Sequence, residues 1–221
     1  MSVRGKIVTA AAALTVVAGI GAAGTLTANA ATKDCGQVCA NFFNSAFGTF
    51  SHPAFVLDVH GQAQQASQPV ALARASAANP REDFGITAQG QVGDFVAAGL
   101  VARGLKAPYG QLQAVEIEYA PKGAPAGLCL GTSSSSSLSP VALRPCGVNS
   151  STIWILDPVT TSTGSYNVLI SGATNRNFQH PEALTAPEPG LQLSIEPLTS
   201  LSTAHLTHQL WGFTQGVLPT S

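Results

Sequence analysis

Apolar and polar residues alternate along several short stretches of this 221-residue chain. Residues 55–59 form one such run, and residues 114–119 set Val115 and Ile117 against Glu116. An alternation with a period of two is typical of a half-buried β-strand. Clusters of Gly, Pro and Ser separate the runs, and no long amphipathic helix is visible after residue 50. The pattern therefore predicts an all-β fold of short strands with a closed architecture.

The chain repeats one segment, Pro-Val-Ala-Leu, at residues 69–72 and 140–143. An apolar strand precedes each copy, and a short strand with one large aromatic residue follows it. A third, more divergent unit has the same order and ends at Trp211. From the first leucine to the closing aromatic, the units span 27, 24 and 27 residues (57 to 84, 130 to 154 and 184 to 211). Three units of one design predict a repeat architecture.

The three units define one expected domain, residues 52–214. Its repeats run over about 52–87, 125–157 and 180–214. Residues 88–113 have no counterpart in the other repeats and are interpreted as an insertion. Within the insertion, the apolar pairs at 95–96 and 100–101 predict a short hairpin.

Residues 31–51 precede the repeats and form an aromatic leader segment. Phe43 and Phe47 stand at helical spacing, which favours one short helix packed on the domain, with an apolar flap as the alternative. The third repeat has little chain left beyond Phe213, so closure of the fold would draw on this leader.

The first 30 residues have the features of a secretory signal peptide. Arg4 and Lys6 give a positive start, residues 7–24 form an uncharged apolar core, and Ala-Asn-Ala at 28–30 is a small-x-small cleavage site. A transmembrane anchor is the alternative, but the run is rich in Ala and Gly and ends at the cleavage site. We therefore expect a secreted, extracellular protein with no stable membrane insertion after the signal is removed.

The charge balance excludes one class of function. Without Arg4 and Lys6, the rest of the chain has 8 basic and 11 acidic residues, a net charge of −3. Its length suffices for one domain with a sizeable core. Scattered basic residues cannot neutralise a row of phosphates, so we expect no nucleic-acid partner.

Four cysteines in a secreted chain predict two disulfides, for which three pairings exist. Cys129 and Cys146, 17 positions apart, bracket a hairpin-like piece of the second repeat, so a bridge between them is expected. Cys35 and Cys39 are left to pair locally and to pin the leader. Their spacing also matches half of a metal site, but the other half is missing, and we expect no metal or cofactor.

Short motifs occur in a fixed order through the second and third repeats. They are Gly127-Leu128-Cys129-Leu130, Val141-Ala142-Leu143-Arg144-Pro145-Cys146, Trp154, and Gln209-Leu210-Trp211. In order and spacing this set resembles the ricin-type β-trefoil, the lectin-like fold of many carbohydrate-binding modules. The chain also resembles a group of secreted actinobacterial proteins with an N-terminal Cys-x-x-x-Cys and a Gly-Leu-Cys-Leu/Val-Gly segment.

The resemblance implies three units closed around a pseudo-threefold axis with one shared core. A unit of this kind cannot bury its apolar face alone, so the three must pack together. Three aromatic residues, Phe84, Trp154 and Trp211, would plug the core. The aliphatic residues that would line it are Leu57, Val70, Leu72, Leu130, Val141, Leu143, Leu184, Leu191 and Leu193.

In the family, each sugar site has four parts: an Asp just after the first strand, a Gln within the second, an aromatic two residues later, and an Asn just before Gln-x-Trp. The corresponding residues are Asp58, Ala71, Ala73 and Arg81 in the first repeat, Gly131, Ala142, Arg144 and Ser151 in the second, and Thr185, Gln192, Ser194 and His208 in the third. The Asp is kept in the first repeat and the Gln in the third, and no repeat keeps its aromatic. The resemblance therefore implies degenerate sugar sites.

We expect weak carbohydrate binding, to extracellular or cell-wall glycans, through the first repeat. Its candidate contacts are Asp58 and nearby His60, with Gln192 and Gln209 as candidates in the third repeat. The alternative for Asp58 is a structural role, as a turn residue whose carboxylate accepts hydrogen bonds from backbone amides. The alternative function is a trefoil scaffold without sugar binding, which presents the insertion and the leader to an extracellular protein partner.

No catalytic motif is evident in the sequence. His205 and His208 lack the helix and the glutamate of a zinc-protease motif, and no Gly-x-Ser-x-Gly elbow occurs. Glu116 and Glu118 share one face of a strand, but outward charges on such a strand are far commoner than a glycosidase pair. We expect no enzymatic activity.

Overall fold

The computed structural model describes residues 31–32, 39–61, 64–76, 78–147, 149–173, 181–198, 204–215 and 217–218. The predicted signal peptide, residues 1–30, and Cys35 lie outside the described residues. In the described part of the chain, no helix is long and apolar enough to cross a membrane.

Within these ranges, twelve strands form one sheet and fall into three groups of four. The first group is β2 (Ala40–Asn44), β3 (Phe55–Val59), β4 (Val70–Arg74) and β5 (Phe84–Gln91). The second is β6 (Gln113–Tyr119), β7 (Leu128–Thr132), β8 (Val141–Pro145) and β9 (Ile153–Thr161). The third is β10 (Gly164–Ser171), β11 (Glu182–Thr185), β12 (Ser194–Pro197) and β13 (Leu210–Gln215). A separate pair joins β1 (Ala31–Thr32) to β14 (Val217–Leu218).

Short helices occupy several of the connections between strands. They are η2 (Pro80–Glu82) before β5, then α1 (Val92–Ala97), η3 (Arg103–Leu105) and α2 (Lys106–Tyr109) between β5 and β6, η4 (Pro121–Gly123) before β7, and η5 (Ala204–Gln209) before β13.

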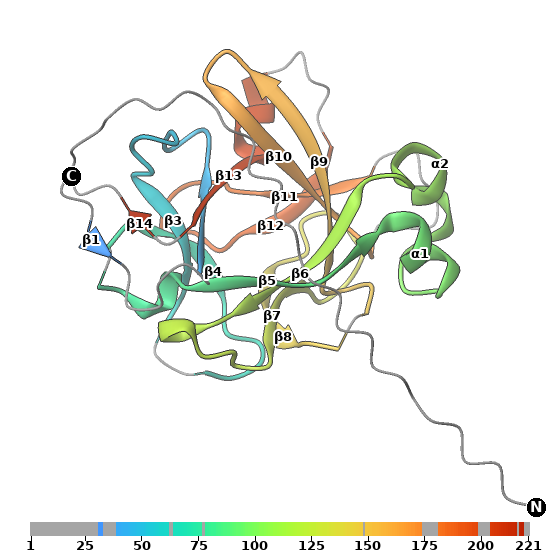
Figure 1. Ribbon diagram of the computed structural model, residues 1–221, viewed down its shortest axis with the longest axis horizontal. Coiled ribbons are helices and arrows are strands. Elements are labelled where there is room, and N and C mark those ends of the chain that lie inside the picture. The colour runs from blue at the N-terminus through green and yellow to red at the C-terminus, as the bar shows by residue number, and fades with distance from the viewer. Residues whose placement is uncertain are drawn as a thin grey trace, which may run out of the picture.

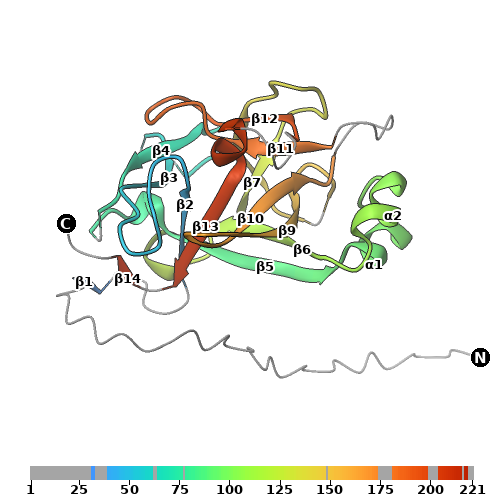
Figure 2. The ribbon, with the colours of Figure 1, turned by 90° about the horizontal axis from the view of Figure 1, so that it is seen from above.

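The first and last strands of each group form a closed six-stranded barrel. Antiparallel pairs run β2–β5, β5–β6, β6–β9, β9–β10, β10–β13 and β13–β2. The middle strands of each group form the hairpins β3–β4, β7–β8 and β11–β12. In Figure 2, β3–β4 and β11–β12 lie on the opposite side of the molecule from β5 and β6. A barrel capped by three hairpins is the β-trefoil architecture, and closure leaves its six strands without a free edge.

The three hairpins meet at a pseudo-threefold axis. At equivalent positions, a backbone N–H of each hairpin donates to a carbonyl of the next: Ser67 to Leu143 (2.7 Å), Leu138 to Ile195 (2.7 Å) and Gly190 to Leu72 (2.8 Å). The three donor residues share a positive φ, of 70°, 65° and 85°. Glycine adopts such a φ freely, whereas Ser and Leu adopt it only where the surrounding structure fixes it. The hairpins of the three sequence units are therefore copies of one structural element.

The three expected plugs lie together in the interior. Phe84, Trp154 and Trp211 are at most 1% exposed and belong to one core cluster. The Nε1–H of Trp154 donates to the Leu130 carbonyl and that of Trp211 to the Leu184 carbonyl, both at 2.9 Å. Each of these bonds ties a closing aromatic to the first strand of the hairpin in its own repeat.

The leader contributes a strand, and the predicted helix is wrong. β2 pairs with β13, β3 and β5, so the leader does close the fold. Phe42 belongs to the main core cluster and Phe43 to a second one, because neighbouring side chains of a strand point to opposite faces. Gly212 on β13 makes room for Phe43, since a Cβ at Gly212 would clash with the Phe43 ring.

Each repeat therefore begins one strand earlier than the sequence indicated. β6 and β10 occupy the place of β2, since each pairs with the last strand of its own repeat and with the last strand of the preceding one. The predicted boundary at residue 52 falls after the first strand of the first repeat. The first strands of the repeats share no sequence motif, so pattern matching finds only the three strands that follow.

The insertion is helical, and the predicted hairpin is wrong. α1 buries Val92 and Val96, four positions apart on one helix face, in the second core cluster. Gly99, at a φ of 75°, ends the helix, and the Leu100 N–H donates to the Phe95 carbonyl. Figure 1 shows α1 and α2 projecting from the barrel beyond the ends of β5 and β6.

The third hairpin has a different register from the one the sequence suggested. Isolated bridges link Pro69 to Ala142, Pro140 to Ser194 and Ala71 to Gln192. By the threefold symmetry, these bridges make Pro69, Pro140 and Gln192 equivalent, and likewise Ala71, Ala142 and Ser194. Leu193, which lies between the two, is therefore the equivalent of Val70 and Val141. Leu191, expected in the core, is instead 54% exposed, while Leu193 and Ile195 are buried.

The disulfide between Cys129 and Cys146 is present as predicted. It lies inside the second repeat and joins β7 to the residue that follows β8. Cys39 is also disulfide-bonded, and no cysteine of the described part is free. The partner expected for Cys39 lies outside the described residues.

Removing the plug of the second repeat, Trp154, should destabilise the core. For Trp154→Ala we expect the free energy of unfolding to fall by about 3–5 kcal/mol, measured by urea denaturation. Trp154→Phe fills most of the space but leaves the Leu130 carbonyl without its donor, so a smaller loss of about 1–3 kcal/mol is expected. The exposed Leu191→Ala serves as the control and should stay within about 0.5 kcal/mol of the wild type. Equal stability of Trp154→Ala and the control would contradict the assignment.

The disulfide should stabilise the fold by restricting the unfolded chain. For the double variant Cys129→Ser, Cys146→Ser, the loop-entropy model gives a loss of about 3 kcal/mol. For a domain of this size that corresponds to a fall in Tm of roughly 6–12 °C. Thermal unfolding followed by circular dichroism measures it, with reduced wild type as a second reference. An unchanged Tm would show that the bridge does not constrain the unfolded state.

Candidate ligand-binding site

The hairpin register locates the family's sugar-binding positions in all three repeats. β3–β4 pairs Asp58 with Ala71, β7–β8 pairs Gly131 with Ala142, and β11–β12 pairs Thr185 with Ser194. Ser194 therefore holds the Gln position of the third repeat, and Glu196, two residues later, holds the aromatic position. The assignment of Gln192 and Ser194 to these positions is wrong by two residues. Pro197 matches Pro145 of the second repeat, and this was the sequence signal that could have fixed the register.

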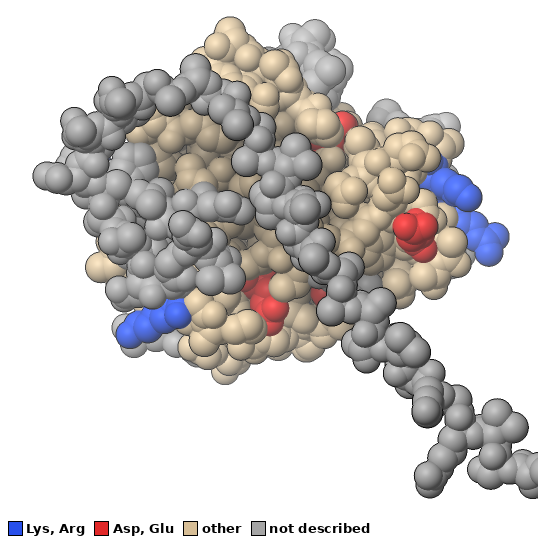
Figure 3. Space-filling model, in the orientation of Figure 1, with Lys and Arg blue, Asp and Glu red and all other residues tan. Residues whose placement is uncertain are grey.

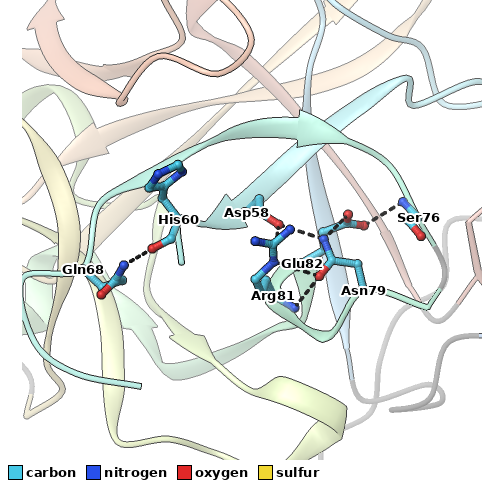
Figure 4. A network of polar contacts seen from close by, with 7 residues as sticks. All are labelled: Asp58, His60, Gln68, Ser76, Asn79, Arg81 and Glu82. Atoms are coloured by element: carbon cyan, nitrogen blue, oxygen red, sulfur yellow. Dashed lines mark hydrogen bonds and ion pairs between the residues drawn. The ribbon is translucent and has the colours of Figure 1, made fainter. Parts of the chain in front are cut away.

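In the first repeat, the protein itself engages the carboxylate of Asp58. Asp58 is 4% exposed, and its Oδ2 accepts from Asn79 Nδ2 at 2.8 Å and lies 3.4 Å from Arg81 Nε (Figure 4). Asn79 Nδ2 also donates to Glu82 Oε1 at 2.8 Å, and Glu82 Oε2 accepts from the Ser76 N–H at 3.0 Å. The family's Asn position is thus occupied by an arginine that covers the aspartate.

His60 does not join this network. Its ring is exposed and turned away from the Asp58 carboxylate, and its backbone carbonyl accepts from the Gln68 amide (Figure 4). Burial raises the pKa of Asp58, and the Asn79 hydrogen bond, the Arg81 charge and the His60 ring oppose that rise in decreasing order. The first repeat therefore holds a structural network rather than an open sugar site.

In the second repeat, side chains fill the equivalent space. A Cβ at Gly131 would lie 2.9 Å from Arg144 Cγ and 2.8 Å from the Ser151 carbonyl oxygen, so Arg144 crosses directly over the position of the family's Asp. Thr152 stands where the family's Gln-x-Trp motif has its Gln, and its hydroxyl donates a hydrogen bond to the Glu116 carboxylate. Glu116 was expected to face solvent and is instead buried.

In the third repeat, the equivalent space is a pocket of about 280 Å³. Its lining consists of Thr185, Ala186, Pro187, Glu196, Pro197, His208 and Gln209. Three of these residues stand at the family's positions: Thr185 for the Asp, Glu196 for the aromatic and His208 for the Asn. Within the described residues, neither a salt bridge nor an overlying side chain fills this third position, in contrast to the first two.

The polar side chains of this pocket are held in place. His208 Nδ1 lies 2.7 Å from the Ala186 carbonyl, so it donates there and directs Nε2 elsewhere. The Phe47 ring stands edge-on to the imidazole, with centroids 5.4 Å apart. Ser194 Oγ donates to Glu196 Oε1 at 3.3 Å. A carboxylate and an oriented imidazole therefore line a small preformed pocket.

The two predicted glutamine contacts have structural roles. Gln209 is buried, and its Nε2 donates to Thr185 Oγ1 and to the Pro197 carbonyl, both at 3.1 Å, so it braces the third-repeat pocket. Gln192 Nε2 donates to the Val141 carbonyl at 3.0 Å, near the pseudo-threefold axis. Asp58 and His60 share the first repeat, but the fold does not bring either glutamine to them.

Metal binding finds no support in the described residues. Within them, no group of three or more His, Cys, Asp or Glu side chains is placed to hold a metal ion.

Comparison with known proteins agrees with the fold. No protein-family model matches the chain, and no curated protein matches its sequence. The designed threefold-symmetric protein ThreeFoil is similar in structure, with a TM-score of 0.52 and 12% identity over 80% of this chain and 98% of that one. A mosquitocidal holotoxin aligns with a TM-score of 0.50 and 11% identity over 80% of this chain and 17% of the toxin.

A lectin of Polyporus squamosus, bound to a human-type influenza-binding epitope, aligns less closely. Its TM-score is 0.48, with 12% identity over 81% of this chain and 49% of the lectin. This chain thus spans less than half of the toxin and of the lectin. The similarity to ThreeFoil supports the threefold-repeated fold, and an identity this low shows the fold alone.

The raised pKa of Asp58 predicts a pH dependence of stability. Because the folded state binds this proton more tightly than the unfolded state, the contribution of Asp58 to stability falls as the pH rises from about 4 through the raised pKa. Asp58→Asn keeps an amide oxygen for Asn79 but does not titrate. We expect the stability of the wild type relative to Asp58→Asn to decline between pH 3.5 and 7, by about 1.4 kcal/mol per unit of pKa shift.

Urea denaturation at pH 3.5, 5 and 7 measures this difference, and the exposed Asp94→Asn is the matched control. A difference between wild type and Asp58→Asn that stays constant or grows with pH would show that burial does not dominate at this carboxylate.

Proposed function

We propose that the protein is a secreted, non-catalytic β-trefoil module that binds carbohydrate weakly through the third repeat. The observation that carries the proposal is the open pocket at the third family position, lined by Glu196 and His208. We place the site in the third repeat and not in the first, which the sequence favoured, because Asn79 and Arg81 already bind the Asp58 carboxylate in the first repeat.

The chemistry of the pocket suits one or two sugar units. Its volume of about 280 Å³ is near the lower end of small-molecule pockets. The Glu196 carboxylate can accept hydrogen bonds from sugar hydroxyls, and the rings of Pro187 and Pro197 offer apolar contact to a sugar face. No Phe, Tyr or Trp stands among the lining residues, which removes about 0.5–1.5 kcal/mol of stacking, so the binding is weak.

Two further points support the proposal. The lining contains a single carboxylate, whereas glycoside hydrolysis usually uses two. Secretion is favoured by the signal-like first 30 residues and by the Cys129–Cys146 disulfide, since disulfides persist in oxidising surroundings.

Loss of the carboxylate should weaken sugar binding. A glycan array with the full chain identifies neutral ligands, and calorimetry then compares variants. We expect Glu196→Gln to weaken binding at least about five-fold, because a charge-assisted hydrogen bond becomes a neutral one. The matched control is Glu188→Gln, an exposed glutamate in the loop between β11 and β12, which should bind as the wild type does.

Two outcomes would count against this site. Binding that is unchanged in Glu196→Gln and lost in Asp58→Asn would return the site to the first repeat. No retention on any glycan would favour the alternative, a sugar-inactive scaffold for a protein partner, which the filled first and second positions would also fit.

A further inference from the structure

A second cavity, of about 330 Å³, borders the family's position in the first repeat and shares only Arg81 with it. It opens between the β4–β5 connection of the first repeat and the β6–β7 connection of the second. Residues of η2 and η4 line it, together with Gln64 and Tyr119. The cavity is therefore a cleft between two repeats rather than a site within one.

The two turns that form the walls of this cleft are anchored to each other. The Ala120 N–H donates to the Asp83 carbonyl and the Lys122 N–H to Asp83 Oδ2, both at 2.9 Å. Lys122 has a φ of 55°, a left-handed conformation that the Asp83 contact holds in place. In η2, the Asn79 side chain accepts from the Arg81 N–H at 3.2 Å and caps the turn. Because Asp83 is buried, the backbone positions of both walls are fixed before any ligand arrives.

The cleft presents hydrogen-bond donors, while its acids face inward. The Arg81 side chain is 39% exposed, and its Nε donates to Asn79 Oδ1 at 3.1 Å. Within the described residues, no hydrogen bond or ion pair engages the Lys122 ammonium, and no hydrogen bond engages the terminal guanidinium nitrogens of Arg81. The carboxylates of Asp58 and Asp83 are buried beneath them. Figure 3 shows that charged side chains are few on the visible face of the molecule.

The cleft also has an apolar side. Pro80 and Pro121 provide it, and Tyr119 borders the cavity between them. The Tyr119 side chain is buried, with its ring packed against Phe84 at a centroid distance of 5.8 Å. Burial and the carboxylates of Asp58 and Asp83 raise the pKa of Tyr119. Its hydroxyl is therefore a proton-bearing donor at neutral pH.

The equivalent cleft between the third and first repeats is closed. There, the β2–β3 connection packs onto η5: Phe47 stands against the His208 ring, and Ser45 Oγ donates to the Thr207 carbonyl at 2.9 Å. The cleft between the first and second repeats has Lys122 and a cavity where the other has a packed phenylalanine. The opening thus distinguishes this pair of repeats from the pair formed by the third and first repeats.

We infer that this cleft binds the carboxylate of an acidic saccharide, with Arg81 and Lys122 holding the carboxylate, the Tyr119 hydroxyl donating to the sugar, and the proline faces taking the sugar ring. The inference rests on the proposed carbohydrate binding but concerns a different site. The charges of Arg81 and Lys122 are partly offset by the buried carboxylates of Asp58 and Asp83. The two cations therefore suit a ligand with one carboxylate, held by directed hydrogen bonds, and they lack the excess positive charge that a polyphosphate requires.

Calorimetry with the full chain tests the inference, using trimers of galacturonic acid and of mannuronic acid and their methyl esters. We expect at least one acid trimer to bind and its methyl ester to bind at least ten-fold more weakly. Lys122→Asn removes the charge with a residue that tolerates the left-handed backbone, and should weaken binding of that acid about five- to ten-fold. Lys106→Asn, on the exposed start of α2, is the matched control and should bind as the wild type does.

The outcome is separable from that of the proposed function. Glu196→Gln should leave the acidic trimer bound, and Lys122→Asn should leave neutral glycans bound. Thermal unfolding verifies that each variant is folded. The inference is overturned if neither acid trimer binds, if acid and ester bind equally, or if Lys122→Asn binds as the wild type does. Equal binding of poly-L-glutamate would also overturn it, in favour of an acidic peptide.

Discussion

The pairing of β13 with β2 is the constraint on which the rest of the structure depends, because it closes the barrel. It joins the last strand of the third repeat to the first strand of the first repeat, from Trp211 opposite Asn44 to Gln215 opposite Ala40. Gly212 leaves room for Phe43 at this seam. Once the ring is closed, the three hairpins are held at fixed places around one axis, and the ligand-binding positions are fixed with them.

The same backbone position carries three different kinds of chemistry around that axis. In the first repeat Asp58 is locked under Arg81, and in the second Arg144 crosses over Gly131. In the third repeat Thr185 and His208 border open space. The fold supplies the symmetry, whereas side chains decide which copy can take a ligand. Side chains also decide which cleft between repeats is open: Phe47 fills the cleft between the third and first repeats, whereas the one between the first and second holds a cavity.

The sequence predicted those parts of the fold that repeat. Hairpin strands and closing aromatics recur because each copy must present apolar side chains to one core, and the Cys129–Cys146 bridge follows from spacing alone. The register of β12 could not be predicted in this way. Leu191, Leu193 and Ile195 follow one apolar alternation, so a shift by two residues leaves the pattern unchanged, and only Pro197 distinguishes the two registers. The contact between Asp58 and Arg81 could not be predicted either, since a salt bridge between a strand and a short helix 23 residues later leaves no local pattern in the sequence. The sequence therefore favoured the first repeat, whereas the site proposed from the structure lies in the third.

The central claim is that one of three equivalent positions remains open to a sugar. Amide chemical shifts recorded by NMR during titration with a neutral glycan that binds the protein test it most directly. The account predicts that the shifts cluster at Thr185, Ala186 and His208, with the amides of Asp58 and Gly131 unmoved. A cluster around Asp58, or equal shifts in all three repeats, would contradict it.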